Sequence, residues 1–155
     1  MEIITTDTKI NYENLKTTYD HIDFTDSLFF DIETTGFAAK NTKLYMIGVL
    51  YVSKETNTFH TIQWFLDNYE DEINILKAFF DFASKFNTLI HFNGNGFDLP
   101  YLEAKATILD FSLDFNTFKH IDLYKSSTKL KNFFKTENLK LKTIEQFLGL
   151  ERKDE

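Results

Sequence analysis

Residues 28–36, which read LFFDIETTG, limit the possible folds of this chain more than any other stretch. An apolar run ends in two carboxylates, Asp31 and Glu33, that stand two positions apart. Residues two apart in a β-strand point to the same face, so both carboxylates would meet at the end of a buried strand. Such anions repel each other unless a cation lies between them, and hard divalent cations prefer oxygen ligands. We interpret the stretch as half of a metal site; the alternative is an exposed strand end with two solvated acids.

Length and composition indicate one domain. The 155 residues are 43% hydrophobic and 26% charged, which suits a single hydrophobic core. There is no cysteine, which excludes disulfides and thiol nucleophiles and fits a reducing cytoplasm, where we expect the protein to be. The N-terminus lacks a signal-peptide pattern, and no run approaches the roughly 20 apolar residues of a membrane span, so we expect no membrane partner.

The net charge of −7 argues against a protein that binds nucleic acid by bulk electrostatic attraction. It does not exclude an enzyme that meets phosphates through metal ions and a local basic patch. One segment is rich in lysine, at Lys119, Lys125, Lys129, Lys131, Lys135, Lys140 and Lys142. A solvated lysine-rich surface is the plainer interpretation of this segment.

Hydrophobic periodicity predicts a mixed sheet with helices on its faces. Short links favour antiparallel neighbours among the first three predicted strands, at residues 28–33, 44–52 and 58–65. The period then changes to that of an amphipathic helix of about four turns, which begins near residue 70. The remaining predicted elements are strands at 88–92 and 119–123 and helices at 97–109, 123–134 and 141–148. Residues 1–25 are weakly patterned, and we expect an N-terminal extension, with a short helix around 11–18, that packs on a domain at 26–155.

A second group of polar residues follows the strand predicted at 88–92. An Asn/Gly turn, at residues 93–96, precedes a helix with an acid, Asp98, near its start. The turn glycines would let the backbone approach a ligand closely. Taken alone, Asp98 could be a plain helix N-cap and Asn93 a turn residue without chemistry.

Together, the stretches FFDIETTG and FNGNGFDLPYL resemble the first and second motifs of the DEDD (DnaQ-like) 3′–5′ exonuclease superfamily. The two motif sequences are most similar to those of the proofreading domain of family B DNA polymerases and of bacterial exonucleases of the YprB type. The resemblance covers about residues 26–153. It implies an α/β, ribonuclease H-like fold: a mixed sheet of three antiparallel strands and then parallel strands, flanked by helices.

The resemblance also implies a metal-dependent 3′–5′ exonuclease that acts on the single-stranded 3′ end of DNA or RNA with two Mg²⁺ or Mn²⁺ ions. Asp31 would bridge the two metals, Glu33 would bind one of them and contact the 3′ end or the attacking water, and Asp98 would help to hold the second. The substrate-binding positions would be Thr34, Thr35, Gly36, Asn93 and Phe97. For Phe97, packing in the core is the plainer interpretation. Two metals about 4 Å apart can activate a water and stabilise the leaving 3′ oxygen, so the chemistry is coherent in itself.

The chain departs from that superfamily at its third motif, Tyr-x-x-x-Asp or His-x-x-x-x-Asp, which supplies a fourth carboxylate. No segment after Gly149 fits, because Asp154 comes too soon and lacks the His or Tyr. Three hypotheses stay open: a chain that lacks its C-terminal helix, which we favour; a degenerate, non-catalytic module that binds nucleic acid; or a complete site that uses His91, His120 or Asp122. A missing helix would expose apolar surface, through which we expect a homodimer.

Other conspicuous residues are expected to be structural. We expect His91 and His120 to be satisfied core histidines, and Asp122 to pair with a lysine or with the backbone. Trp64 and the Phe-rich segment at residues 78–82 are expected in the core.

Overall fold

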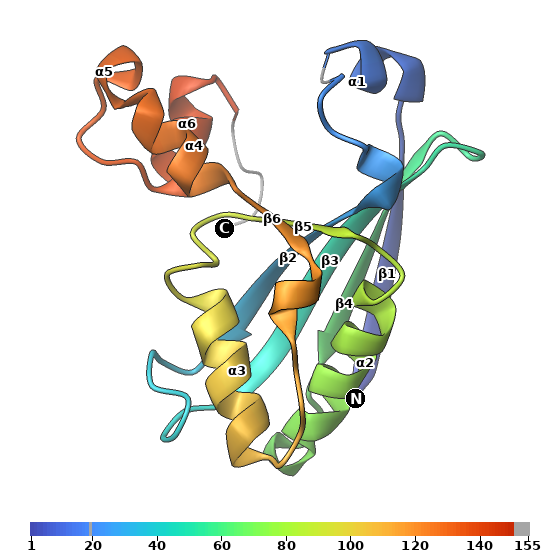
Figure 1. The fold of residues 1–155 in the computed structure, drawn as a ribbon, viewed down its shortest axis with the longest axis vertical. Coiled ribbons are helices and arrows are strands. Elements are labelled where there is room, and N and C mark those ends of the chain that lie inside the picture. Colours follow the sequence, from blue (N-terminus) through green and yellow to red (C-terminus); the bar gives the residue numbers. More distant parts are fainter. Residues whose placement is uncertain (19, 151–155) are drawn as a thin grey trace.

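The computed structural model describes residues 1–18 and 20–150, so Asp154 lies outside the described residues. Its main feature is a six-stranded sheet in the order β1-β4-β3-β2-β5-β6 (Figure 1). The strands are β1 (Glu2–Lys9), β2 (Ser27–Thr34), β3 (Leu44–Ser53), β4 (Thr58–Phe65), β5 (Thr88–His91) and β6 (Lys119–Asp122). β1, β4, β3 and β2 pair antiparallel, whereas β5 runs parallel to β2 and β6 parallel to β5. The predicted mixed sheet is confirmed.

β1 was not predicted. It pairs with β4 over its whole length, and all eight of its residues are exposed. Because β1 buries neither face, its sequence lacks the alternation that marks a half-buried strand. Its polar and charged side chains suit an edge strand that must avoid pairing with other chains. The short helix expected in this region is present as α1 (Tyr12–Thr18).

The other helices are α2 (Glu72–Ala83), α3 (Asp98–Ile108), α4 (Leu123–Lys129), α5 (Lys131–Phe134) and α6 (Leu141–Phe147). Short 3-10 turns, η1 (Phe24–Asp26), η2 (Tyr69–Asp71) and η3 (Phe115–Thr117), complete the fold. The single helix predicted at 123–134 is broken at Leu130 into α4 and α5. The hydroxyls of Ser127 and Thr128 donate to the carbonyls of Tyr124 and Lys125, both at 2.7 Å, and such bonds compete with the helical ladder. None of the helices that the structure describes is long and apolar enough to cross a membrane.

The main core lies between the sheet and the pair α2 and α3, which cover one of its faces (Figure 1). Ile75, Leu76 and Phe79 are fully buried, because helical spacing places them on one face of α2. Trp64 is also buried, as expected, and packs edge-on against Phe82 of α2.

Helices α4, α5 and α6 form a second, smaller unit, the α4–α6 lobe (residues 123–148), which stands apart from α2 and α3 beyond the end of β6 (Figure 1). Its own small core contains Phe134, Leu139 and Ile144, and Phe92 from the turn after β5 packs against it. The lobe is thereby attached to the sheet near the turn that leads into α3.

Candidate active site

β2 presents Asp31 and Glu33 on one face of the sheet near its carboxyl end. Along the strand, Phe30 and Ile32 are buried while Asp31 and Glu33 are exposed. Both carboxylates therefore point to the same face, as the sequence predicted. Asp31 pairs with Gly48 of β3, whose missing side chain leaves space beside the carboxylate.

Asp98, the first residue of α3, reaches across to β2. It is only 5% exposed, and its Oδ1 accepts a hydrogen bond from the backbone N–H of Ile32 at 3.2 Å. Because Ile32 stands between the two acids of β2, this bond places Asp98 beside them. Asp98 is not the plain N-cap considered above, since Phe97 occupies that position and no side chain caps the helix.

The environment of Asp98 disfavours its ionised form. Burial is the main reason that its pKa is raised to about 6, and the negative charge of Asp31 acts in the same direction. The hydrogen bond from Ile32 opposes both effects without cancelling them. The repulsion between a buried carboxylate and a second carboxylate beside it is offset when a divalent cation binds both.

Two side chains from β5 and β6 hold the turn before α3. Asp122, at the end of β6, accepts a hydrogen bond from the N–H of Asn93 at 2.9 Å and two more from the start of α4. His91 Nδ1 accepts a hydrogen bond from the N–H of Gly94 at 3.1 Å. Asn93 has a φ of 61°, in the left-handed region that Asn tolerates. Asp122 thus pairs with the backbone, as expected.

The fit around this turn is tight. A Cβ at Gly94 would lie 2.6 Å from the ring of His91, so only glycine fits there. His91 is buried, as predicted, whereas His120 is only half-buried. Neither is fully satisfied: the His91 Nε2 and His120 Nδ1 atoms are buried and have no hydrogen-bond partner among the described groups. Burial lowers the pKa of His91, which favours the neutral ring that Gly94 requires as an acceptor.

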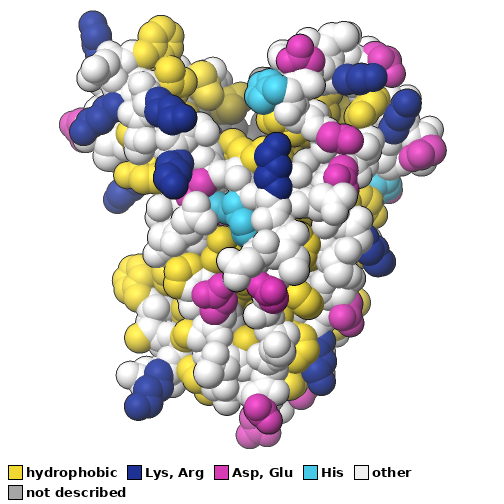
Figure 2. Space-filling model, viewed as in Figure 1, with side chains coloured by type: hydrophobic (Ala, Val, Ile, Leu, Met, Phe, Trp, Pro, Cys, Tyr) yellow, Lys and Arg dark blue, Asp and Glu magenta, His cyan; other side chains and the backbone are white. Residues whose placement is uncertain are grey.

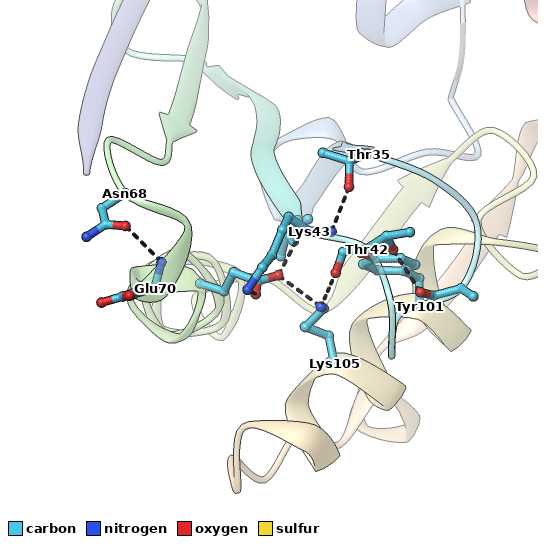
Figure 3. Close-up of polar contacts among 10 residues, drawn as sticks. Thr35, Thr42, Lys43, Asn68, Glu70, Tyr101 and Lys105 are labelled. Atoms are coloured by element: carbon cyan, nitrogen blue, oxygen red, sulfur yellow. Dashed lines mark hydrogen bonds and ion pairs between the residues drawn. The ribbon is translucent and has the colours of Figure 1, made fainter.

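The segment after β2, residues 35–43, is tied to α2 and α3 by a buried ionic network (Figure 3). Glu72 of α2 accepts hydrogen bonds from the N–H of Leu44 at 2.8 Å and from the Nζ atoms of Lys43 and Lys105, both at 3.0 Å. Lys105 also donates to the carbonyl of Thr42. Burial alone would raise the pKa of Glu72, but the Leu44 N–H and the two lysines outweigh it, so the pKa lies below its ordinary value. Sequence patterns gave no sign of this network, because its members lie far apart along the chain.

Three of the predicted substrate-binding residues, Thr34, Thr35 and Gly36, directly follow the two acids of β2. Thr34 donates through Oγ1 to the carbonyl of Gly36 at 2.8 Å, and Thr35 Oγ1 accepts from the N–H of Lys43 at 2.8 Å. Both hydroxyls therefore shape the loop that follows β2. Asn93 is exposed at the turn before α3.

Phe97 is half-buried and packs partly on the core. Its other neighbour is Phe37, which lies edge-on at 5.9 Å between ring centroids and is 91% exposed. Sequence analysis missed Phe37, although an aromatic residue directly after Gly36 in an otherwise polar loop was a usable signal.

An apolar groove of about 520 Å³ opens on the sheet face that carries Asp31. Residues from five strands and from two helices of the lobe line it, among them Phe29, Asp31, Met46, Ile90, Leu123 and Leu141. The groove thus joins the first acid of β2 to the α4–α6 lobe.

The donor set fits a hard divalent cation such as Mg²⁺ or Mn²⁺, because the side chains gathered at the end of β2 are carboxylates. Asp31 and Asp98 are close enough for the charge of one to raise the pKa of the other. Glu33 is exposed, with the Tyr45 hydroxyl 3.5 Å from its Oε2, and would have to turn inward to join them. Within the described part of the chain, no three acidic or histidine side chains are grouped closely enough to hold a metal ion as they stand.

Residues 28–155 match the family model of the RNase_H superfamily, and the chain belongs to that superfamily. The DNA polymerase of Autographa californica nuclear polyhedrosis virus is 30% identical over 107 residues, which cover 51% of this chain and 11% of the polymerase. That of Bombyx mori nuclear polyhedrosis virus is 29% identical, with the same coverage. The chain thus spans about a tenth of the length of these relatives.

Solved structures share the fold. The family B DNA polymerase of Pyrobaculum calidifontis aligns with a TM-score of 0.53 and 21% identity over 66% of this chain and 16% of the polymerase. Escherichia coli exonuclease I in complex with a dT13 oligonucleotide aligns with a TM-score of 0.59 and 12% identity, over 81% of this chain and 36% of the exonuclease. The predicted ribonuclease H-like fold, and the resemblance to this group of proteins, are confirmed.

Proposed function

We propose that this chain is a metal-dependent 3′–5′ exonuclease domain that hydrolyses phosphodiester bonds at single-stranded DNA or RNA 3′ ends. The observation that carries the proposal is the hydrogen bond from the N–H of Ile32 to Asp98. It brings acids from two distant segments to one end of the sheet, where a divalent cation would relieve their repulsion. Membership of the RNase_H superfamily, and the fold shared with an exonuclease bound to an oligonucleotide, support it.

In this proposal the carboxylates hold two Mg²⁺ or Mn²⁺ ions. When bound, such ions supply an activated water and stabilise the charge that develops on the leaving oxygen. Asp31 would contribute a carboxylate to both ions, Glu33 would turn to bind one of them, and Asp98 would help to hold the second. Hydrolysis breaks the bond between phosphorus and the 3′ oxygen, releases a nucleoside 5′-monophosphate and leaves a new 3′-hydroxyl.

The chain's own residues would place the substrate. Backbone groups of Thr34, Thr35 and Gly36 would line the pocket for the terminal nucleotide, and Asn93 would steady the opposite turn. Phe97, together with Phe37, offers an aromatic surface for a base. Asp98 must lose its proton to hold a cation, so the affinity for Mg²⁺ or Mn²⁺ should rise as the pH increases through about 6.

The second candidate function is a non-catalytic module that binds nucleic acid on the same fold. It is favoured by one observation: no three acidic or histidine side chains of the described residues are grouped closely enough to hold a metal ion as they stand. In this case the apolar groove and the turns around β2 would bind a single strand of nucleic acid without cleaving it.

A labelled single strand separates the two functions. With Mn²⁺, the wild-type chain should shorten a 5′-labelled strand from its 3′ end, and Asp31→Asn and Asp98→Asn should abolish this shortening. Asp81→Asn, which changes an exposed aspartate on α2, is the matched control and should keep full activity. A strand that is bound but never shortened supports the binding module, and a strand that is neither bound nor shortened contradicts both functions.

Two further predictions accompany the proposal. We expect a cytoplasmic location, and we expect the chain to form a homodimer. Sedimentation analysis of the wild-type chain would test the dimer.

A further inference from the structure

Charge is divided unevenly along this chain. Residues 119–148 contain seven lysines and three acidic residues, whereas the rest contains ten basic and twenty-one acidic residues. Six of the lysines belong to the α4–α6 lobe and all six are exposed: Lys125, Lys129, Lys131, Lys135, Lys140 and Lys142. Figure 2 shows dark-blue lysines spread over this lobe. Among the residues that the structure describes, none of the six forms an ion pair, so the lobe is a basic unit on an acidic protein.

Exposed aromatic rings lie among these lysines. Phe133 is 71% exposed and Phe147 is 45% exposed, and their rings meet edge-on at 6.1 Å. Both also contact the buried ring of Phe134, at 6.0 Å and 5.2 Å. The exposed rings are therefore held in place by a small core instead of being loose on the surface. Lysines around fixed, exposed rings are the combination that holds single-stranded nucleic acid, with phosphates on the cations and bases on the rings.

The lobe begins at the same level of the sheet as the acids of β2. Phe29, Ile90 and Ile121 lie in one row across β2, β5 and β6. Two residues further along, β2 carries Asp31 and β6 has given way to α4 at Leu123. The apolar groove, lined by residues of both regions, connects them.

We propose that the α4–α6 lobe is a binding surface for single-stranded nucleic acid, which holds the strand on the 5′ side of the end that reaches Asp31. The orientation of the bound strand in this inference, with its 3′ end at Asp31, rests on the proposed function. The lysines contact backbone phosphates without regard to sequence, and Phe133 and Phe147 stack on a base. The groove gives the strand a path from the lobe to the acids.

Binding of a fluorescein-labelled oligothymidine in EDTA, followed by anisotropy at several salt concentrations, tests the lobe without cleavage. The triple variant Lys129→Gln/Lys131→Gln/Lys135→Gln should bind at least about tenfold more weakly at low salt. Its slope of log affinity against log salt should be shallower by about 2, since each lost phosphate contact removes about 0.7 for single strands. Phe133→Ala should weaken binding by roughly 5- to 100-fold, as expected for one stacked base.

The matched control is Lys16→Gln/Lys54→Gln/Lys77→Gln, which removes the same charge from exposed lysines outside the lobe. It should bind like the wild type. The inference is overturned if both triple variants lose affinity equally, if the lobe variants bind normally, or if the lobe binds anionic phosphatidylserine vesicles but no oligonucleotide. Thermal unfolding of each variant shows whether a loss of binding is only a loss of folding.

The test also separates this inference from the nuclease. In Asp31→Asn, which removes cleavage, the lobe substitutions should weaken binding in EDTA by the same factor as in the wild type. Lobe-dependent binding without metal-dependent cleavage would support the binding surface and contradict the proposed nuclease activity. Metal-dependent cleavage without lobe-dependent binding would support the nuclease activity and contradict the binding surface.

Discussion

Two carboxylates in this molecule are almost equally buried but have opposite surroundings. Glu72 is 3% exposed and lies 3.0 Å from each of two lysines, Lys43 and Lys105. Asp98 is 5% exposed, and the charges that act on it come from Asp31 and Asp122. The pKa of Glu72 is lowered, whereas burial and the neighbouring charge raise the pKa of Asp98 to about 6.

This difference distinguishes a carboxylate with a structural role, Glu72, from one with a candidate functional role, Asp98. Glu72 is compensated, and it fastens the loop after β2 to both α2 and α3. Asp98 is held by backbone N–H groups against a second carboxylate, which lowers the stability of the ion-free protein. Strongly perturbed carboxylates in such positions are a mark of functional sites.

Glu72→Gln should have the largest effect. Removing this anion leaves Lys105 buried without its counter-charge, which costs about 3–5 kcal/mol of unfolding free energy. Because the folded pKa of Glu72 is lowered, its contribution is present above pH 4.5 and is lost as the pH falls through the folded pKa. Urea unfolding should therefore show a difference in unfolding free energy between the variant and the wild type that is smaller at pH 3 than at pH 7. Glu70→Gln, at an exposed position on η2, is the control; equal effects of the two variants would contradict compensation by lysine.

Asp98→Asn should act in the opposite direction. The raised pKa means that the folded wild type loses stability as the pH rises from 3.8 to about 6, since Asp98 ionises in a place that disfavours charge. In EDTA at pH 8 the variant should be more stable by about 3 kcal/mol, at about 1.4 kcal/mol per pKa unit, and the gain should disappear near pH 4. Adding Mn²⁺ should stabilise the wild type and not the variant. A variant less stable than wild type at pH 8 would mean that the Asp98 charge is compensated after all.

Gly94→Ala tests how firmly the turn before α3 holds Asp98 in its buried position beside Asp31. The new Cβ would meet the His91 ring at 2.6 Å, and relieving this clash should cost about 1–3 kcal/mol by thermal unfolding. Gly48→Ala is the control for stability, because its Cβ would meet only Gln63, at 3.9 Å. If Gly94→Ala is as stable as the control, the turn is looser than its contacts indicate.

Asp31→Asn should have the smallest effect and would separate burial from charge at Asp98. Removing the Asp31 charge should lower the pKa of Asp98 only part of the way toward 3.8, because burial is the larger cause. Carbon-13 NMR titration of the carboxyl groups measures this shift. An unchanged pKa would show that the two carboxylates are further apart than the structure has them.

The sequence predicted the strands β2 to β6 closely because most of their side chains are buried or half-buried, and burial leaves a pattern in the sequence. It missed β1, whose residues are all exposed, and the break at Leu130, which depends on hydroxyl bonds to carbonyls. In the site, local motifs were enough to select Asp31, Glu33 and Asp98 as candidates, and their catalytic roles stay predictions. The network around Glu72 depends on contacts between distant segments, which no local pattern encodes. Phe37 was missed although its place directly after Gly36 was a local signal.

The central claim is that Asp98 and Asp31 form a divalent-cation site. Its most direct test is the pKa of Asp98, measured by carbon-13 NMR with and without saturating Mg²⁺, with Glu72 as the internal reference. We predict that Mg²⁺ lowers the pKa of Asp98 well below 6 and leaves Glu72 unchanged. A pKa of Asp98 that stays near 6 in Mg²⁺ would contradict the claim.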